Sequence, residues 1–449
     1  MTFRISAALS IIAAGLLLPV AAARADKPIT LEARLAQPVM KTGETQKNFL
    51  RIGLNGCEPK GSDSRNPVNV AFVIDRSGSM SGDRIAQARE AAILAINRLD
   101  ANDVASVVIF DDKVDILIPA QPVTDRAPFI ERIRNIGVRG QTAIHAGVMQ
   151  GAAEVRKFKD DRRLNRVVLL SDGQANVGPR RADDFAKLGR ALLGEGISVS
   201  TIGLGLDYNE DLMLQLARAS DGNHAFASAP NDLIQIFNRE FDDVLAACAQ
   251  TVSIDVKLQP GIKVVRALSR EGSVEDARAR FNLNQVYAAT EHYVLLELEF
   301  DGKAAGGDEQ DFGRVHVAYT LPETGAQQAI DAPIRGRFSA SADEVKGSRD
   351  QVVTVAVVEQ TARERAQEAV KLRDQGRYEE AARLFQQNVD EIRTAQSALA
   401  APSPILDRLG GQYSAFSKST TAVQGSQWLM DRKLLRQMDG GSVSGGARY

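Results

Sequence analysis

Four short apolar runs, separated by stretches with helical periodicity, constrain the fold of this chain more than any other feature. The runs are continuous, which is the pattern of strands buried on both faces of a parallel sheet. They are Val68–Ile74, Val104–Phe110, Arg166–Leu170 and Ile197–Ile202. Helical periodicity lies between them, for example over Asp83–Leu99. This alternation of strand and helix predicts an α/β domain with a doubly wound, mostly parallel sheet.

Three shorter elements complete the predicted α/β domain, which we place at residues 68–247. They are a helix near Glu210–Ala219, a strand at His224–Ala227 and a helix over Asn231–Ala247. The whole chain of 449 residues is too long for one core, so further domains are expected on either side.

The segments on both sides of the α/β domain alternate between apolar and polar residues, as half-buried strands do. Residues 26–57 contain such a run at Asn48–Leu54, and residues 248–340 contain one at Val252–Leu258. The first segment is too short to bury a core of its own. We therefore expect the two segments to form one β-rich domain into which the α/β domain is inserted.

The C-terminal part of the chain has helical periodicity over residues 341–438. Two long helical segments, Val352–Arg373 and Tyr378–Ser397, lie on either side of Gly376 and predict a helical hairpin. The last residues, 439–449, are rich in glycine and serine and are expected to be disordered.

The N-terminus has the pattern of a signal peptide over residues 1–25. Arg4 supplies a positive charge, Ile5–Val20 is an apolar run, and Ala23-Arg24-Ala25 is a small-x-small cleavage site. A retained membrane anchor is the alternative, but the run is short for a spanning helix. We expect a bacterial periplasmic or secreted protein with no membrane span after cleavage. A net charge of −2 gives no reason to expect nucleic acid as a partner.

Oxygen-bearing side chains follow the first buried strand at alternate positions. Asp75, Ser77 and Ser79 lie where ligands collect in a doubly wound sheet, beyond the carboxyl ends of the strands. Hard oxygen donors of this kind suit Mg²⁺ or a similar cation. Taken alone this signal is weak, because Ser and Asp after a strand are also ordinary helix N-caps.

Two further residues strengthen the prediction of a cation site. Thr142 begins a helix, and Asp172 follows the third buried strand, so it emerges on the same edge of the sheet as Asp75. Asp-x-Ser-x-Ser, then Thr, then Asp in this order resembles the metal-ion-dependent adhesion site of von Willebrand factor type A domains. The resemblance implies Mg²⁺, or else Mn²⁺ or Ca²⁺, as the cofactor. It also implies direct binding by Ser77 and Ser79, and an open coordination position for an acidic residue of a protein partner.

The flanking β-rich segments resemble those of bacterial secreted relatives of inter-alpha-trypsin inhibitor heavy chains and calcium-activated chloride channel regulators. In such a fold both ends of the type A domain lie on the face opposite the metal site. The resemblance therefore implies that Cys57 and Cys248 are close together, and export would allow them to form a disulfide. Two separate buried thiols are the alternative.

The resemblance implies a non-catalytic function, namely cation-dependent protein binding, in adhesion or assembly, in the bacterial cell envelope. A metal-dependent phosphohydrolase is the alternative, since such enzymes also place an aspartate after a buried strand. Such enzymes have the pattern Asp-x-Asp at that point, however, and in this chain Ser77 occupies the place of the second aspartate. The sequence also contains no Walker loop, Gly-x-Ser-x-Gly elbow or His-Glu-x-x-His motif. An envelope scaffold that binds its partner through the helical region is a further alternative.

Overall fold

The central sheet has six strands in the described part of the chain, in the order β6-β5-β4-β7-β8-β9. The computed structural model describes residues 28–58, 66–160, 162–172, 175–205, 208–227, 232–236, 246–302, 307–422 and 426–440. Neighbouring strands of this sheet run parallel except for the antiparallel pair β5–β6. The strands are β4 (Val68–Asp75), β5 (Val104–Phe110), β6 (Val114–Pro122), β7 (Leu164–Ser171), β8 (Ile197–Leu204) and β9 (His224–Ala227). The predicted doubly wound, mostly parallel sheet is therefore confirmed.

The four apolar runs of the sequence are the four inner strands, and every residue of β4, β5, β7 and β8 is buried. The edge strand β6 was not predicted. It is mostly exposed or half-buried and contains Pro119 and Pro122, so it lacks the apolar pattern of its neighbours. Proline is tolerated there because an edge strand has one row of backbone groups outside the ladder.

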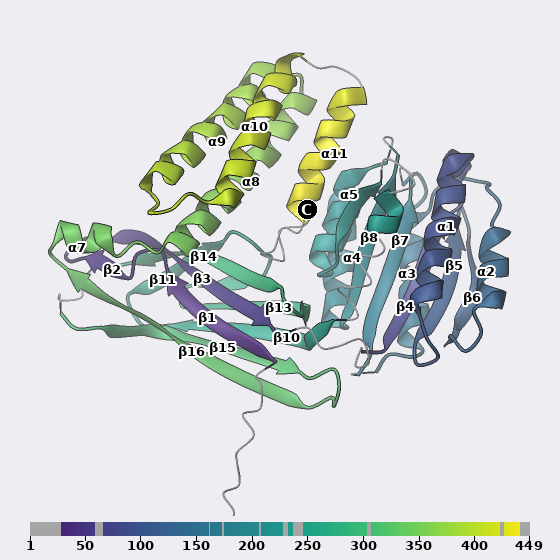
Figure 1. The fold of residues 1–449 in the computed structure, drawn as a ribbon, viewed down its shortest axis with the longest axis horizontal. Helices are drawn as coiled ribbons and strands as arrows, with labels where there is room; N and C mark the ends of the chain where they lie inside the picture. Colours follow the sequence, from purple (N-terminus) through teal and green to yellow (C-terminus); the bar gives the residue numbers. More distant parts are fainter. Residues whose placement is uncertain are drawn as a thin grey trace, which may run out of the picture.

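Helices cover both faces of the central sheet (Figure 1). Successive strand residues point to opposite faces, so Phe72 packs into one apolar core and Val73 into the other. The first core also includes residues of α1 (Asp83–Arg98) and α2 (Ala127–Arg134). The second includes residues of α3 (Ile144–Arg156), α4 (Ala182–Gly194) and α5 (Glu210–Ala219).

The helix predicted over Asn231–Ala247 is wrong at its end. Residues 232–236 are helical and residues 237–245 lie outside the described part, but Ala247 is the first residue of β10. Ala247 pairs with Tyr287 in the neighbouring strand, across a register shift from the rest of the ladder. Pairing with a distant strand thus decides the structure here, and the local sequence carries no sign of it.

Two packed sheets form the β-rich domain, with β-strands from both sides of the inserted α/β domain. One sheet has the order β1-β3-β14-β11, and the other has the order β12-β13-β10-β15-β16-β2. Strand β3, from before the insertion, pairs with β14, from after it, between Gln46–Phe300 and Asn55–Glu291. A common apolar core contains residues of both sheets, such as Ile52 and Ile254. The predicted insertion is confirmed.

The strands of this β-sandwich are β1 (Ile29–Leu35), β2 (Val39–Lys41), β3 (Gln46–Gly56), β10 (Ala247–Leu258), β11 (Ile262–Ala267), β12 (Ser273–Glu275), β13 (Arg278–Tyr287), β14 (Glu291–Phe300), β15 (Gln310–Thr320) and β16 (Gln327–Ser339).

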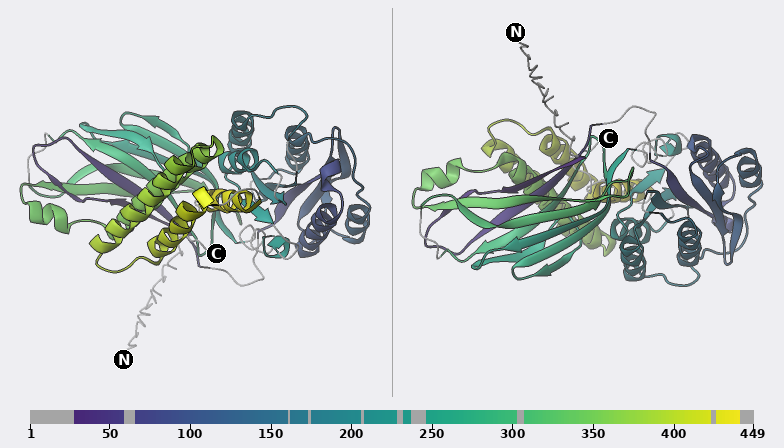
Figure 2. Two further views of the ribbon diagram at one scale, coloured as in Figure 1. Left: turned by 90° about the horizontal axis from the view of Figure 1, so that it is seen from above. Right: turned by 90° about the horizontal axis from the view of Figure 1, so that it is seen from below.

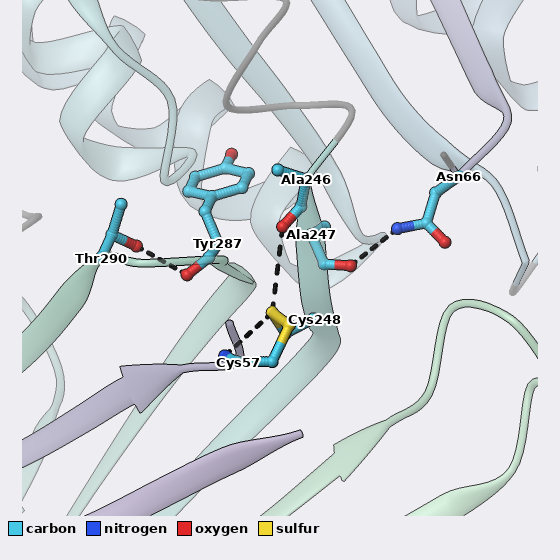
Figure 3. The surroundings of a disulfide bond; sticks show 7 residues. All are labelled: Cys57, Asn66, Ala246, Ala247, Cys248, Tyr287 and Thr290. Atoms are coloured by element: carbon cyan, nitrogen blue, oxygen red, sulfur yellow. Dashed lines mark hydrogen bonds between the residues drawn. A yellow bond between two sulfur atoms is a disulfide. The ribbon is translucent and has the colours of Figure 1, made fainter. Parts of the chain in front are cut away.

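The two ends of the inserted domain meet at a disulfide between Cys57 and Cys248, whose Cα atoms are 5.9 Å apart. Figure 3 shows this junction, where the side chain of Asn66 donates to the carbonyl oxygen of Ala247 at 2.7 Å. Asn66 lies just before β4, so the entry and exit of the domain are held together at the amino edge of its sheet. The predicted pairing of the two cysteines is confirmed.

The C-terminal region is helical, as predicted, and more extensive than a hairpin. The hairpin consists of α8 (Gln351–Asp374) and α9 (Tyr378–Ala398), and it is preceded by the short α7 (Ala342–Gly347) and followed by α10 (Pro404–Ala422) and α11 (Ser426–Gly440). Seen from above, these helices lie over the β-sandwich, and α11 reaches the α/β domain (Figure 2).

Helix α11 is fixed to the α/β domain by charged side chains. Lys433 is 1% exposed, and its Nζ lies 3.0 Å from Glu210 Oε2 and 3.2 Å from the carbonyl oxygen of Tyr208. Arg432 contacts both Glu210 and Asp211 at the start of α5. Helical structure was predicted for this region, but these ion pairs were not, because their partners lie more than two hundred positions apart in the sequence.

Two sequence predictions fall mainly outside the described residues. The signal peptide over residues 1–25 lies there entirely, and so do residues 441–449 of the predicted disordered tail. The first two residues of that tail, 439 and 440, are part of α11, which corrects the start of the predicted disorder. Within the described ranges, no helix is long and apolar enough to cross a membrane.

Candidate functional site

Asp75 is the last residue of β4, and its carboxylate is held rigidly at the carboxyl edge of the sheet. Its Oδ1 accepts a hydrogen bond from the backbone nitrogen of Ser77 at 2.8 Å, and its Oδ2 accepts one from Ser171 Oγ at 2.5 Å. The first bond closes a tight turn, after which the 3-10 helix η1 (Gly78–Met80) carries Ser79. Asp75 has no exposed surface.

A chain of side-chain hydrogen bonds connects the predicted residues of the first and third loops. Ser77 Oγ lies 3.1 Å from Ser79 Oγ, and Ser79 Oγ donates to Asp172 Oδ1 at 2.8 Å. Asp172 follows β7, the neighbour of β4, and is 1% exposed. Asp75, Ser77, Ser79 and Asp172, which are separated by up to about a hundred positions in the sequence, therefore form one group.

Thr142 joins this group through its backbone. Its nitrogen donates to Asn176 Oδ1 at 2.7 Å, and its carbonyl oxygen accepts from the backbone nitrogen of Asn176 at 3.1 Å. On the other side, the carbonyl oxygen of Gly140 accepts from the nitrogen of Gly78 at 3.1 Å. The segment that carries Thr142 is thus hydrogen-bonded to the loops after both β4 and β7, and Thr142 itself is buried.

Gly140 is required for this arrangement. Its φ of +71° lies in the left-handed region, and a Cβ at this position would lie 2.2 Å from Asp112 Oδ1 and 3.0 Å from Asp111 Cβ. The loop before Thr142 can pack closely against the end of β5 because this residue has no side chain.

Burial controls the electrostatics of the group. It raises the pKa of Asp75 to about 6, hydrogen bonds from Ser171 and Ser77 oppose this, and the nearby charge of Asp172 adds to it. Two buried carboxylates in one small group repel each other, so a bound cation would lower the cost of keeping both ionised. The three hydroxyls and two carboxylates are hard oxygen donors, which fit Mg²⁺, Mn²⁺ or Ca²⁺.

Hydroxyl groups are essential to such a cation site. Over the part of the chain that the structure describes, no group of three or more His, Cys, Asp and Glu side chains is placed to hold a metal ion. The group has two carboxylates, so a cation held there would take its remaining protein ligands from the hydroxyls of Ser77, Ser79 and Thr142.

Arg84 is a member of the site that the sequence analysis missed. It lies in the first turn of α1, and its Nη1 donates to Asp172 Oδ2 at 2.5 Å and to the carbonyl oxygen of Ser79 at 3.3 Å. Its position next to Asp83 in the chain gives no sign of this contact, because the partner carboxylate lies 88 positions away.

A second charged group that the sequence analysis missed lies beside the site, at the end of β5. Arg76 Nε and Arg139 Nε lie 2.8 Å and 2.7 Å from the same oxygen, Asp111 Oδ2. Burial alone would raise the pKa of Asp111, but the hydrogen bond from Arg139 and the charges of both arginines lower it below its ordinary value. The side chain of Arg76 therefore pairs with Asp111 and Asp115, although its backbone lies between Asp75 and Ser77.

Comparisons with known proteins identify the α/β domain. Residues 69–239 match the model of the von Willebrand factor type A domain. An uncharacterized protein of Synechocystis sp. is 28% identical over 304 residues, which are 65% of this chain and 70% of that protein. The inter-alpha-trypsin inhibitor heavy chain H3 of Rattus norvegicus is 31% identical over 172 residues, or 36% of this chain and 19% of the heavy chain. This chain therefore aligns with about a fifth of the heavy chain's length.

A solved structure shares the larger architecture as well. A von Willebrand factor type A protein from Catenulispora acidiphila has a TM-score of 0.72 at 15% identity, covering 92% of this chain and 97% of that chain. At this identity the likeness shows the fold alone. It extends across the inserted domain, the β-sandwich and the C-terminal helices.

Proposed function

Residues 69–239 belong to the von Willebrand factor type A domain family, and we propose that the protein binds a protein partner through a divalent cation. The cation is held by Asp75, Ser77, Ser79, Thr142 and Asp172. The observation that carries the proposal is the hydrogen-bonded group of two buried carboxylates and two serine hydroxyls at the carboxyl edge of the sheet.

The donor set explains why the partner contributes an acidic residue. Mg²⁺ requires near-octahedral oxygen coordination and sheds water reluctantly, so a site built largely from hydroxyls binds it weakly and leaves a position for another ligand. The bound ion supplies positive charge that its own site only partly neutralises, and a carboxylate of the partner is the group this charge attracts. The residues of this chain orient the ion and hold its position.

We place the protein in the bacterial envelope, either in the periplasm or outside the cell. The sequence pattern of residues 1–25 supports export, and the disulfide between Cys57 and Cys248 supports an oxidising compartment. Adhesion to another protein or assembly of an envelope complex would both use such a site. We propose a non-catalytic role, and phosphatase activity toward a generic phosphate ester that is lost in Asp75→Asn would contradict it.

Calorimetry with Mg²⁺ or Mn²⁺ tests the site. We expect weak binding by the full-length mature protein, and loss of binding in Asp75→Asn and in the double variant Ser77→Ala/Ser79→Ala. The matched control is Ser81→Ala, since Ser81 lies in the same loop and its hydroxyl bonds the carbonyl oxygen of Gly78 and not the group. Unchanged cation affinity in the first two variants would overturn the proposed site.

Capture from envelope extract tests the partner class. Immobilised wild-type protein should retain a partner with Mg²⁺ and release it on addition of chelator, and immobilised Asp75→Asn should retain none. Equal retention of the same partner by both proteins in chelator would show that binding does not use the cation.

A further inference from the structure

We propose that Arg84 is a built-in positive charge that weakens cation binding at this site by occupying one oxygen of Asp172. The inference rests on the proposed function, and it concerns a positioning residue that acts through Asp172. Arg84 thereby keeps the bound ion poorly neutralised and attractive to the acidic partner.

The first support is the division of the Asp172 carboxylate between two groups. Its Oδ2 lies 2.5 Å from Arg84 Nη1, and its Oδ1 accepts from Ser79 Oγ at 2.8 Å. Both oxygens are thus hydrogen-bonded inside the protein, and the side chain is fully buried. A charge-assisted hydrogen bond to guanidinium is strong and directional, so Arg84 competes with a cation for Asp172.

The second support is that the guanidinium is confined. Its Nη1 also donates to the carbonyl oxygen of Ser79 at 3.3 Å. On another side it lies against Gly205, directly after β8, where a Cβ would be 3.0 Å from Arg84 Nε and 3.2 Å from Cζ. Gly205 has a φ of +77°, a conformation that favours glycine, so this contact is built into the backbone. Arg84 is therefore held between the ends of β4, β7 and β8.

The third support is partial exposure. The Arg84 side chain is 30% exposed, whereas that of Asp172 has no exposed surface. The Arg84 side chain therefore reaches the surface beside the group, where a partner would approach. Its field lowers the affinity for a free cation and raises the attraction for an incoming carboxylate, since like charges repel and opposite charges attract over a few ångströms.

Calorimetric titration of Mn²⁺ into the full-length mature protein tests the inference. Arg84→Gln should bind Mn²⁺ about tenfold more tightly than wild type, the order expected when one nearby charge is removed. Arg84→Lys, which keeps the charge but loses the planar fork, should lie between the two. The matched control is Arg98→Gln, which removes the same charge from the last turn of the same helix and should leave the affinity unchanged.

The outcomes separate the two proposals. If Asp75→Asn loses Mn²⁺ binding while Arg84→Gln binds with the wild-type affinity or more weakly, the inference about Arg84 is overturned and the site stands. An equal gain in Arg98→Gln would also overturn it, because the effect would then follow net charge. Unchanged binding in Asp75→Asn would overturn the site and, with it, the inference. Circular dichroism in chelator checks that each variant is folded.

Discussion

The two edges of the central sheet differ in how their residues are held. At the carboxyl edge, the loops after β4 and β7 and the segment before α3 are joined by hydrogen bonds among Asp75, Ser77, Ser79 and Asp172 and by the backbone of Thr142. At the amino edge, a covalent bond between Cys57 and Cys248 joins the domain to the β-sandwich. Hydrogen bonds thus join the loops at the carboxyl edge, and a disulfide joins the chain segments at the amino edge.

Further contacts at the amino edge are buried and include charged side chains. Arg166 of β7 donates to Gln285 of β13 at 3.1 Å, and Asn284 donates to Ser198 of β8 at 2.8 Å. The ion pair there, between Asp221 and Arg270 at 2.6 Å, is also nearly inaccessible to water. The amino edge thus carries the covalent connection to the β-sandwich, whereas ion pairs attach α11 on the carboxyl side, at the start of α5.

The largest effect on stability should come from removing the disulfide. The bond links residues 191 positions apart, and constraining so long a loop stabilises by roughly 5 kcal/mol in the chain-entropy model. Cys57→Ser/Cys248→Ser should therefore unfold at clearly lower urea concentration, as followed by circular dichroism. Its cation affinity should remain that of wild type, and a parallel loss of affinity would show that the two edges are coupled.

Acid should weaken the β-sandwich through His292 of β14, whose two ring nitrogens have no hydrogen-bond partner among the described residues. Burial lowers the pKa of His292 to about 4, with Arg270 lowering it further and Asp221 opposing. The unfolded chain takes up this proton near pH 6.5 and the folded chain near pH 4. The contribution of neutral His292 to the free energy of unfolding is thus fully present above pH 6.5. It is lost as the pH falls toward 4, by at most about 3 kcal/mol.

Replacing His292 with leucine isolates this contribution. The difference in the free energy of unfolding between pH 7 and pH 4.5, measured with urea, should shrink in His292→Leu relative to wild type. His224, whose pKa burial lowers to about 3, remains in both proteins and serves as the common background. If this pH-dependent difference is the same in His292→Leu and wild type, protonation of His292 does not cause the loss of stability in acid.

The smallest effect on stability should follow Asp75→Asn at the carboxyl edge, within about 1 kcal/mol in chelator. Asparagine keeps an oxygen for the backbone nitrogen of Ser77, and its amide can donate to the hydroxyl of Ser171, which can act as acceptor. Binding to the native state raises the melting temperature, so Mg²⁺ should raise it for wild type and leave the variant unchanged. A large loss of stability in chelator would mean that Asp75 also anchors the fold.

The sequence was sufficient for features with a local pattern. The continuous apolar runs predicted β4, β5, β7 and β8 because both faces of these strands are buried. The strand β6 carries no such pattern, since it is an edge strand. The ion pair that attaches α11 to α5 through Lys433 and Glu210 has no local pattern either, because it joins distant parts of the chain.

The candidate site divides in the same way. Asp75, Ser77 and Ser79 have a recognisable spacing, and Asp172 could be placed because it ends a neighbouring parallel strand. Arg84 and Asp111 have no motif, and their roles arise only when the ends of β4, β5 and β7 come together. The sequence motif therefore predicts which side chains offer oxygen ligands. It does not predict which charged side chains lie beside those ligands in the fold.

Anomalous diffraction from crystals of the full-length mature protein grown with Mn²⁺ would show whether the carboxyl edge binds a cation. We expect a Mn²⁺ peak within about 2.2 Å of the hydroxyl oxygens of Ser77 and Ser79, at the edge where Asp75 and Asp172 lie, with an exchangeable ligand in one position. A Mn²⁺ peak elsewhere, with none at this group when the ion is in excess, would mean that the carboxyl edge is not the cation site.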